Sequence, residues 1–195
     1  MKPVERELRG TLEAGQDLVA AGYAGLEGAR RIAKAREAEL SAWFSRTYIE
    51  RMQQGTGRII DEDSVPWREY GATEWECAGE GGIFTALWNL SGAYRRGFQV
   101  DLYRIPVRQD TIEVCERYEL NPYRLYSKNC VIAAADNGYH LAERLIREGI
   151  PAAVIGVVSR GIGREIHYGQ VRGFLERPRE DELVSVNLWK KETMV

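Results

Sequence analysis

The amino-acid sequence predicts an α+β domain in which a mixed β-sheet is layered with helices and follows an N-terminal helical segment. Two apolar runs of strand length, residues 130–135 and 153–158, predict strands that are buried on both faces of the sheet. Between the expected strands, apolar residues recur at helical spacing, as at Ile83, Leu87 and Leu90. Strands that alternate with helices in this way favour helices packed on a sheet.

The other elements follow from periodicity and turn signals along the chain. Further strands are expected at residues 15–20, 75–77 and 98–102, and the run at 153–158 is expected within a strand at 151–159. Residues 165–168 and 171–175 are expected to form a hairpin with a two-residue turn. Helices are expected at residues 25–44, 47–53 and 108–118. Within residues 61–70 a helix is expected to begin with a proline in its first turn. Two more helices are expected, one from residue 83 that stops at residue 97 and one from residue 138 to about 148. Residues 187–190 form either a last helix or a docked extended segment.

Two helical faces carry specific expectations. In the helix at residues 108–118, Cys115 lies at a spacing that favours the core over a nucleophile. In the helix after residue 138, Leu141, Leu145 and Ile146 are expected to face inward. His140 and His167 lack the neighbouring Cys or carboxylate pattern of a metal site.

Composition excludes several classes of protein. Of 195 residues, 44% are hydrophobic and 29% are charged, which is typical of a globular domain rather than a disordered chain. The net charge is -2 and no Lys/Arg-rich run is interleaved with aromatics, so nucleic acid is not the expected partner. No apolar run is long enough to cross a membrane and no signal peptide is evident, so a cytoplasmic protein with free thiols is expected.

The candidate binding residues are Glu80, Gly81, Gly82 and Ile83, at the turn between an expected strand and the helix that follows it. A helix start presents free backbone amides that can hold an anion such as a phosphate. The alternative is a helix start that needs small residues for close packing. Because short glycine-rich strings are weak motifs, the packing interpretation is favoured from the turn alone.

From this turn onward the chain resembles the C-terminal domain of the AIR-synthase-related superfamily, and it is most similar to the hydrogenase-maturation-factor-like members. The resemblance is carried by the strings EGGIFTALW at 80–88, VDL at 100–102, IPVRQ at 105–109, EVCE at 113–116, LNPY at 120–123 and GIPAAVIG at 149–156. It extends back to GQDLV at 15–19 and GLEG at 25–28, which in such proteins resemble the closing strand of an N-terminal domain and interdomain helices.

The resemblance implies a two-domain enzyme whose N-terminal domain supplies most of an ATP and magnesium site and forms a homodimer. Here only fourteen residues precede Gly15, so ATP and magnesium are expected only together with a partner domain. Cys77 and Gly79 stand where relatives have Asp and Thr, and residues 127–129 (SKN) stand where they often have Ser-Gly-Ser. The C-terminal cysteine of the maturation factor is also missing. The expected division is an interdomain remnant at 1–70 and the C-terminal-type domain at 71–195.

The leading hypothesis is a stand-alone module that does not catalyse a reaction by itself and acts as a binding or assembly subunit. Its former interdomain face, around Leu26 to Trp67, is expected to be covered by a second copy of the chain or by a separate N-terminal-domain protein. Two alternatives stay open. One is the C-terminal half of a split ATP-dependent maturation or synthetase enzyme, and the other is a nucleotide or anion sensor.

Overall fold

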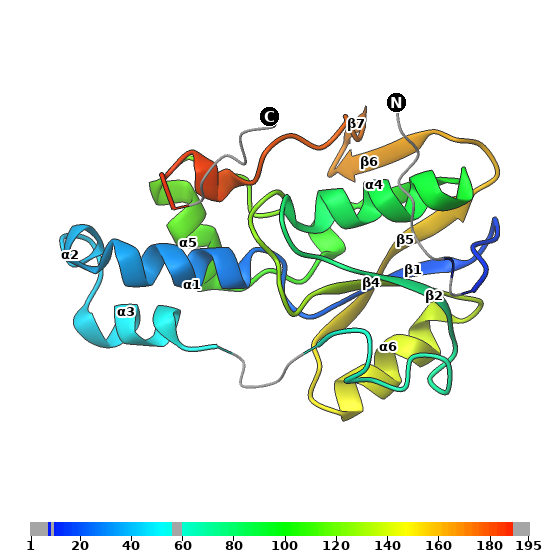
Figure 1. Ribbon diagram of the computed structural model, residues 1–195, viewed down its shortest axis with the longest axis horizontal. Helices are drawn as coiled ribbons and strands as arrows, with labels where there is room; N and C mark the ends of the chain where they lie inside the picture. The colour runs from blue at the N-terminus through cyan, green and yellow to red at the C-terminus, as the bar shows by residue number, and fades with distance from the viewer. Residues whose placement is uncertain (1–7, 9, 56–59, 189–195) are drawn as a thin grey trace, which may run out of the picture.

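The computed structural model describes residues 8, 10–55 and 60–188 of the chain (Figure 1). The strands are β1 Asp17–Ala21, β2 Ala72–Cys77, β3 Gly97–Asp101, β4 Val131–Ala135, β5 Ala152–Ser159, β6 Arg164–Tyr168 and β7 Val171–Phe174. The α-helices are α1 Leu26–Ala35, α2 Glu37–Leu40, α3 Arg46–Gln53, α4 Gly82–Tyr94, α5 Gln109–Arg117 and α6 Gly138–Arg147, and two short 3-10 helices are η1 Leu102–Arg104 and η2 Glu182–Val184.

The described strands form one mixed sheet in the order β2-β4-β1-β5-β3-β6-β7. All neighbouring strands are antiparallel except β3 and β6, which are parallel. The α+β class with a mixed sheet is therefore confirmed. β1 lies between β4 and β5, so the strand that resembled the closing strand of another domain pairs inside this sheet. The division of the chain at residue 70 stays a prediction.

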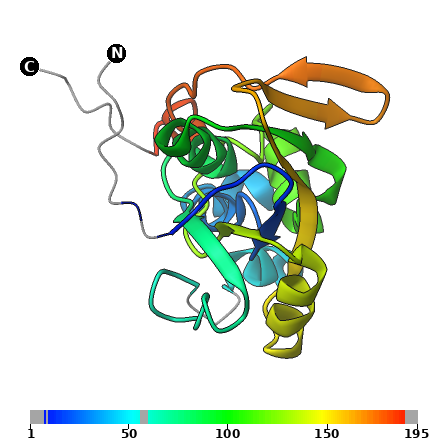
Figure 2. The ribbon, with the colours of Figure 1, turned by 90° about the vertical axis from the view of Figure 1, so that its right-hand side faces the viewer.

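Helix α4 lies on one face of the sheet and α6 on the other, as Figures 1 and 2 show from two directions. The β1–β4 pair is buried on both faces, and each cross-strand pair places a large side chain opposite a small one. A large residue thereby fills the space left by its small neighbour, which keeps each face even enough for a helix to pack on it. The pairs are Leu18–Ala134 and Ala20–Ile132 towards α4, and Val19–Ala133 and Ala21–Val131 towards α6.

A third apolar cluster lies beside the sheet, among α1, α3, α5 and η2. The prediction of a single helix at residues 25–44 is wrong. The chain leaves helical geometry at Arg36, with φ -119° and ψ 26°, so that α1 ends at Ala35 and the short helix α2 follows it. The Arg36 guanidinium donates to the Val186 carbonyl oxygen at 3.0 Å. The bend accompanies burial of Leu40. Leu40 lies in the same apolar cluster as Val186, although the two residues are far apart in the sequence.

The proline-containing segment at residues 61–70 forms bends and turns instead of the expected helix. Side chains of the segment bond its own backbone: Asp61 Oδ1 accepts from the amide of Ser64 at 2.9 Å, and Ser64 Oγ accepts from the amide of Asp61 at 2.8 Å. Trp67 Nε1 donates to the Asp61 carbonyl oxygen at 3.0 Å. Such bonds compete with the helical pattern.

Two helix boundaries and faces also differ from expectation. Helix α4 ends at Tyr94 with Arg95 in the left-handed region, at φ 50°, and Gly97 is the first residue of β3 instead of the helix stop. On α6, Leu141 and Leu145 are buried as predicted, whereas Ile146 is 56% exposed. The helix turns Ile146 away from the sheet because it is adjacent in sequence to the inward-facing Leu145.

The face expected around Leu26 to Trp67 is mostly covered within the chain itself. Its large apolar side chains at Leu26, Ile32 and Trp67 are buried, Ile32 in the cluster beside the sheet and Trp67 in a cluster on the sheet. Trp43 is 61% exposed, and the Arg117 guanidinium lies 3.7 Å from the centre of its ring. Exposed apolar side chains gather instead near β6 and β7. No helix in the described part of the chain combines the length and apolar character needed to cross a membrane.

Two isoleucine substitutions test the layering. Ile132→Ala in β4 removes a fully buried side chain and should lower the free energy of unfolding by about 2–5 kcal/mol. Ile146→Ala on α6 is the matched control and should change it by less than about 0.5 kcal/mol. Urea denaturation followed by circular dichroism measures both values, and equal losses would contradict the assignment of the two positions.

Candidate functional site

The turn at residues 79–83 connects β2 to α4 and contains the four predicted binding residues. Gly81 and Gly82 both adopt left-handed backbone angles, at φ 72° and 66°. A Cβ atom on Gly82 would lie 2.4 Å from the Tyr123 carbonyl oxygen and 2.8 Å from that of Leu125. Glycine is therefore required here by backbone geometry and close packing, whatever the loop binds.

Three backbone amides at this helix start, those of Gly81, Gly82 and Phe84, are bonded within the chain, whereas free amides were expected from the sequence. Gly81 N–H donates to Asp181 Oδ2 at 2.7 Å. Gly82 N–H donates to the Gly79 carbonyl oxygen at 3.1 Å, and Phe84 N–H donates to the Tyr123 carbonyl oxygen at 3.1 Å. A carboxylate of the chain itself thus lies where an external anion would bind.

Asp181 reaches this loop from the segment that precedes η2, and its side chain is 1% exposed. Its second oxygen accepts from the amide of Leu183 at 2.9 Å and caps η2. Burial raises the pKa of Asp181 above its usual value, and hydrogen bonds from the backbone amides of Leu183 and Gly81 oppose the rise. Sequence reasoning missed this residue because it predicted no element or contact for the charged segment before residue 187. An aspartate two residues before a buried leucine was the available signal for a cap.

Ser127 joins the loop to the start of α1. Its hydroxyl accepts from the amide of Gly25 at 2.8 Å and donates to the Leu125 carbonyl oxygen at 2.7 Å. Its own amide donates to the Gly79 carbonyl oxygen at 3.0 Å. Ser127 is fully buried, so the position where relatives often have Ser-Gly-Ser serves here to hold three chain segments together.

The four predicted residues have different surroundings. Glu80 is exposed, whereas Gly81 and Gly82 are buried and Ile83, in the first turn of α4, packs in the core between that helix and the sheet. In this arrangement the Gly81 amide that a phosphate would need already donates to Asp181. The loop as it stands does not fit a nucleotide phosphate, and cofactor binding by these residues stays a prediction.

Two of the three cysteines, Cys115 and Cys130, do not supply an activated thiol. Cys115 is 2% exposed, and burial, followed by the charges of Glu182 and Glu116, raises its pKa to about 12. The prediction that Cys115 belongs to the core is confirmed. Burial also raises the pKa of Cys130 to about 12. Within residues 8, 10–55 and 60–188, no group of three or more His, Cys, Asp or Glu side chains is arranged to hold a metal ion.

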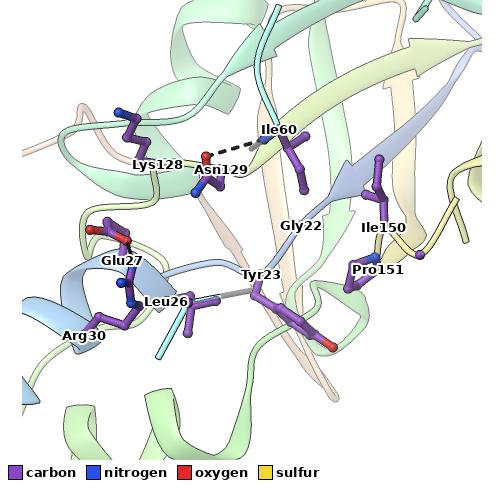
Figure 3. Close-up of a pocket in the computed structure, with 12 residues that line it drawn as sticks. Gly22, Tyr23, Leu26, Glu27, Arg30, Ile60, Lys128, Asn129, Ile150 and Pro151 are labelled. Atoms are coloured by element: carbon purple, nitrogen blue, oxygen red, sulfur yellow. Dashed lines mark hydrogen bonds and ion pairs between the residues drawn. The ribbon is translucent and has the colours of Figure 1, made fainter. Parts of the chain in front are cut away.

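A small pocket opens beyond the end of β1, and its lining includes Tyr23, Arg30, Lys128 and Ile150 (Figure 3). Its volume is about 40 Å³, far below the roughly 300–1,000 Å³ of known ligand sites. The Arg30 guanidinium is bonded to Glu27 and donates to the Gln53 carbonyl oxygen at 3.2 Å. The pocket is therefore too small, and its arginine too well paired, to be the leading candidate for a ligand.

The chain has the AIR-synthase-like fold, which confirms the fold resemblance found in the sequence. No family model matches the sequence, and no curated protein matches it significantly.

Several solved structures share this fold. E. coli HypE, a hydrogenase maturation protein, is 20% identical with a TM-score of 0.65, over 91% of this chain and 54% of HypE. Thiamine-monophosphate kinase from Stenotrophomonas maltophilia is 17% identical with a TM-score of 0.60, over 83% of this chain and 52% of the kinase. T. maritima PurL complexed with AMPPCP is 17% identical with a TM-score of 0.54, over 88% of this chain and 27% of PurL. The chain spans about half the length of HypE and of the kinase.

Substitution of Asp181 tests its place in the loop. Asp181→Ala leaves the buried amides of Gly81 and Leu183 without their acceptor, so the free energy of unfolding should fall by about 1–3 kcal/mol at neutral pH. Asp63→Ala, at an exposed aspartate, is the control and should change it by less than about 0.5 kcal/mol. Urea denaturation measures both.

The same variant has a defined pH dependence. Because the pKa of Asp181 is raised in the folded protein, the protonation-dependent part of its contribution to stability is full below its ordinary pKa of 3.8 and is lost as the pH rises through the folded value, while the hydrogen bonds to Gly81 and Leu183 remain. The stability advantage of the wild type over Asp181→Ala should therefore be larger near pH 4 than at neutral pH. An advantage that grows towards neutral pH would contradict the buried carboxyl.

Proposed function

We propose that this chain has no catalysis of its own and acts as a binding or assembly subunit related to hydrogenase-maturation-type factors. The observation that carries the proposal is the filled loop at the start of α4. Asp181 Oδ2 accepts from Gly81 at 2.7 Å, and the adjoining amides donate to carbonyl oxygens of the chain. A loop satisfied from within needs no ligand to be stable.

An exposed apolar surface supports the binding role. The exposed fractions near the β6–β7 hairpin are 74% at Ile162, 67% at Val171, 66% at Phe174, 63% at Tyr103 and 53% at Tyr168. Figure 2 shows that the hairpin projects from the rest of the sheet. Large exposed apolar groups of this kind are typical of interaction sites when they are contiguous. A HypE–HypF complex is among the structures similar to this chain, so a protein of this fold does assemble with another protein.

The partner is either a second copy of the chain or a separate protein. Val171→Ser combined with Phe174→Ser should weaken the assembly at least tenfold, because the two exposed apolar side chains that a partner would bury are replaced by polar ones. Tyr139→Ser, at a residue on α6 that is 68% exposed, is the control and should leave the assembly intact.

Native mass spectrometry of the protein purified from its own cells, together with sedimentation over a wide concentration range, measures that assembly. A species heavier than the 22.2 kDa chain is expected. A clean monomer at every concentration, with no copurified protein, would overturn the binding or assembly role.

A second candidate is the C-terminal half of a split ATP-dependent enzyme that a partner chain completes. It is favoured by the length of the match, since this chain spans about half of HypE, and a HypE structure in complex with ATP is among the similar ones. In that case a partner would have to displace Asp181 from the Gly81 amide before a phosphate could bind there.

Thermal unfolding with nucleotide separates these candidates from a nucleotide sensor. Millimolar ATP with magnesium should leave the melting temperature of the isolated chain unchanged, because the Gly81 amide already donates to Asp181. A nucleotide that did bind, at a hundred times its Kd, would add about 2.7 kcal/mol of stability and raise the melting temperature. A rise that is lost in Glu80→Ala and kept in the exposed control Glu69→Ala would support the sensor instead. ATP turnover by the isolated chain would remove the non-catalytic proposal.

A further inference from the structure

An open groove of about 740 Å³ lies between the β6–β7 hairpin and the helices beside the sheet. One wall is formed by η1 and the end of β6, and the other by the C-terminal end of α5, residues 119–124 and η2. This volume lies within the range of known ligand sites, about 300–1,000 Å³. The groove shares Tyr103 and Tyr168 with the exposed apolar surface, so the two features are continuous.

The first wall of the groove is aromatic. Tyr103 and Tyr168 stack with their ring centres 4.5 Å apart, and a hydrogen bond with Tyr168 raises the pKa of Tyr103. Tyr123, which belongs to residues 119–124 on the opposite wall, stacks on Phe84 at 5.5 Å and donates its hydroxyl to the Leu102 carbonyl oxygen at 3.0 Å, on the first wall. Because the hydroxyl groups are bonded and the rings are stacked, these tyrosines are held in place as fixed aromatic surfaces.

The opposite wall is acidic. Glu116 and Glu119 are exposed at the end of α5, and Glu182 is half-buried at the start of η2. Arg124 is the cation of this wall, and its charge opposes the rise that burial causes in the pKa of Glu182. Among the described residues, neither Glu116 nor Glu119 forms an ion pair through its side chain. The wall therefore has an excess of negative charge that faces the tyrosines.

Glu119 also occupies an unusual backbone position. It adopts φ 55° directly after α5, and the following amide, of Leu120, donates to the Cys115 carbonyl oxygen at 2.8 Å. Glycine or asparagine is the ordinary residue at such a helix end. A glutamate there is strained by about 1 kcal/mol or more, and that conformation fixes where its side chain leaves the backbone.

We propose that this groove binds an arginine- or lysine-bearing segment of a partner protein. The inference rests on the proposed binding function and specifies the chemistry of the partner. A guanidinium or ammonium group is attracted to tyrosine ring faces and is neutralised by Glu116 and Glu119, while its aliphatic stem packs on Pro122. The acidic wall repels phosphate-bearing partners, so charge complementarity selects a basic protein segment.

The test is a titration of the full chain with the acetylated peptide Gly-Arg-Leu-Arg-Gly, followed by amide chemical shifts in NMR. Shifts should be confined to residues that line the groove. The same peptide with citrulline in place of arginine, which has the same shape without the charge, should bind at least tenfold more weakly.

Two paired variants locate the binding. Each paired variant should weaken binding of the arginine peptide at least tenfold. One pair is Glu116→Gln with Glu119→Gln, and the other is Tyr103→Leu with Tyr168→Leu. The matched controls are Glu13→Gln with Glu69→Gln, and Tyr139→Leu, all at exposed positions outside the groove. These should change the dissociation constant less than twofold. Amide spectra and melting temperatures verify that every variant is folded.

The inference is overturned if no shift occurs at millimolar peptide, if the citrulline peptide binds equally well, or if the groove variants bind like the controls. Concentration-dependent shifts at the same residues without peptide would also overturn it, because they would identify a second copy of the chain as the occupant. The outcome is separable from the proposed function. An assembled protein that ignores the arginine peptide refutes only the groove, whereas a monomer without partners refutes the binding subunit.

Discussion

The pairing of β1 with β4 and β5 is the constraint on which the rest of the structure depends. Because both faces of β1 and β4 are buried, every position must fit a helix or loop packed above it. The ends of these strands also set the helix starts. Asp17 in β1 accepts from the amide of Gly138 at the start of α6, at 2.8 Å. Beside β4, the Cys130 carbonyl oxygen accepts from the amide of Ala78 at 2.8 Å, just before the loop that begins α4. The candidate site is thus positioned by the centre of the sheet.

Asp181 gives this loop an internal anion. Its carboxyl is buried at a cost, as the raised pKa shows, and the amides of Gly81 and Leu183 offset that cost by donating to it. An external anion would compete with a group that is tethered to the same molecule, and tethering acts like a high local concentration. Only displacement of the segment around η2 would free the Gly81 amide. For this reason the Gly81 amide is not available to a nucleotide phosphate in this arrangement of the chain.

Local signals in the sequence predicted local features well. The apolar run at 130–135 became the buried strand β4, the stripe at Ile83 became the inner face of α4, and Gly169 and Gln170 became the hairpin turn. Distant contacts were not predictable in this way. Asp181 meets Gly81 across 100 residues, and Arg36 reaches Val186 across 150. Periodicity reports which face of an element is apolar and contains no information on which distant polar group meets it. The turn at 61–70 differed for a local reason, since its side chains bond the backbone in place of a helix.

The glycines at the start of α4 show why a motif of this kind is ambiguous. A packed helix start and an anion-binding loop both require positive φ angles and a missing side chain. At Gly82 close packing excludes a side chain, because a Cβ would lie 2.4 Å from the Tyr123 carbonyl oxygen. The residue types are therefore the same in both cases. What distinguishes them is the acceptor of the amide protons, and at Gly81 that acceptor is a carboxylate of the chain itself. The exposed hairpin and the acidic, tyrosine-lined groove are the surfaces at which we propose that a partner binds.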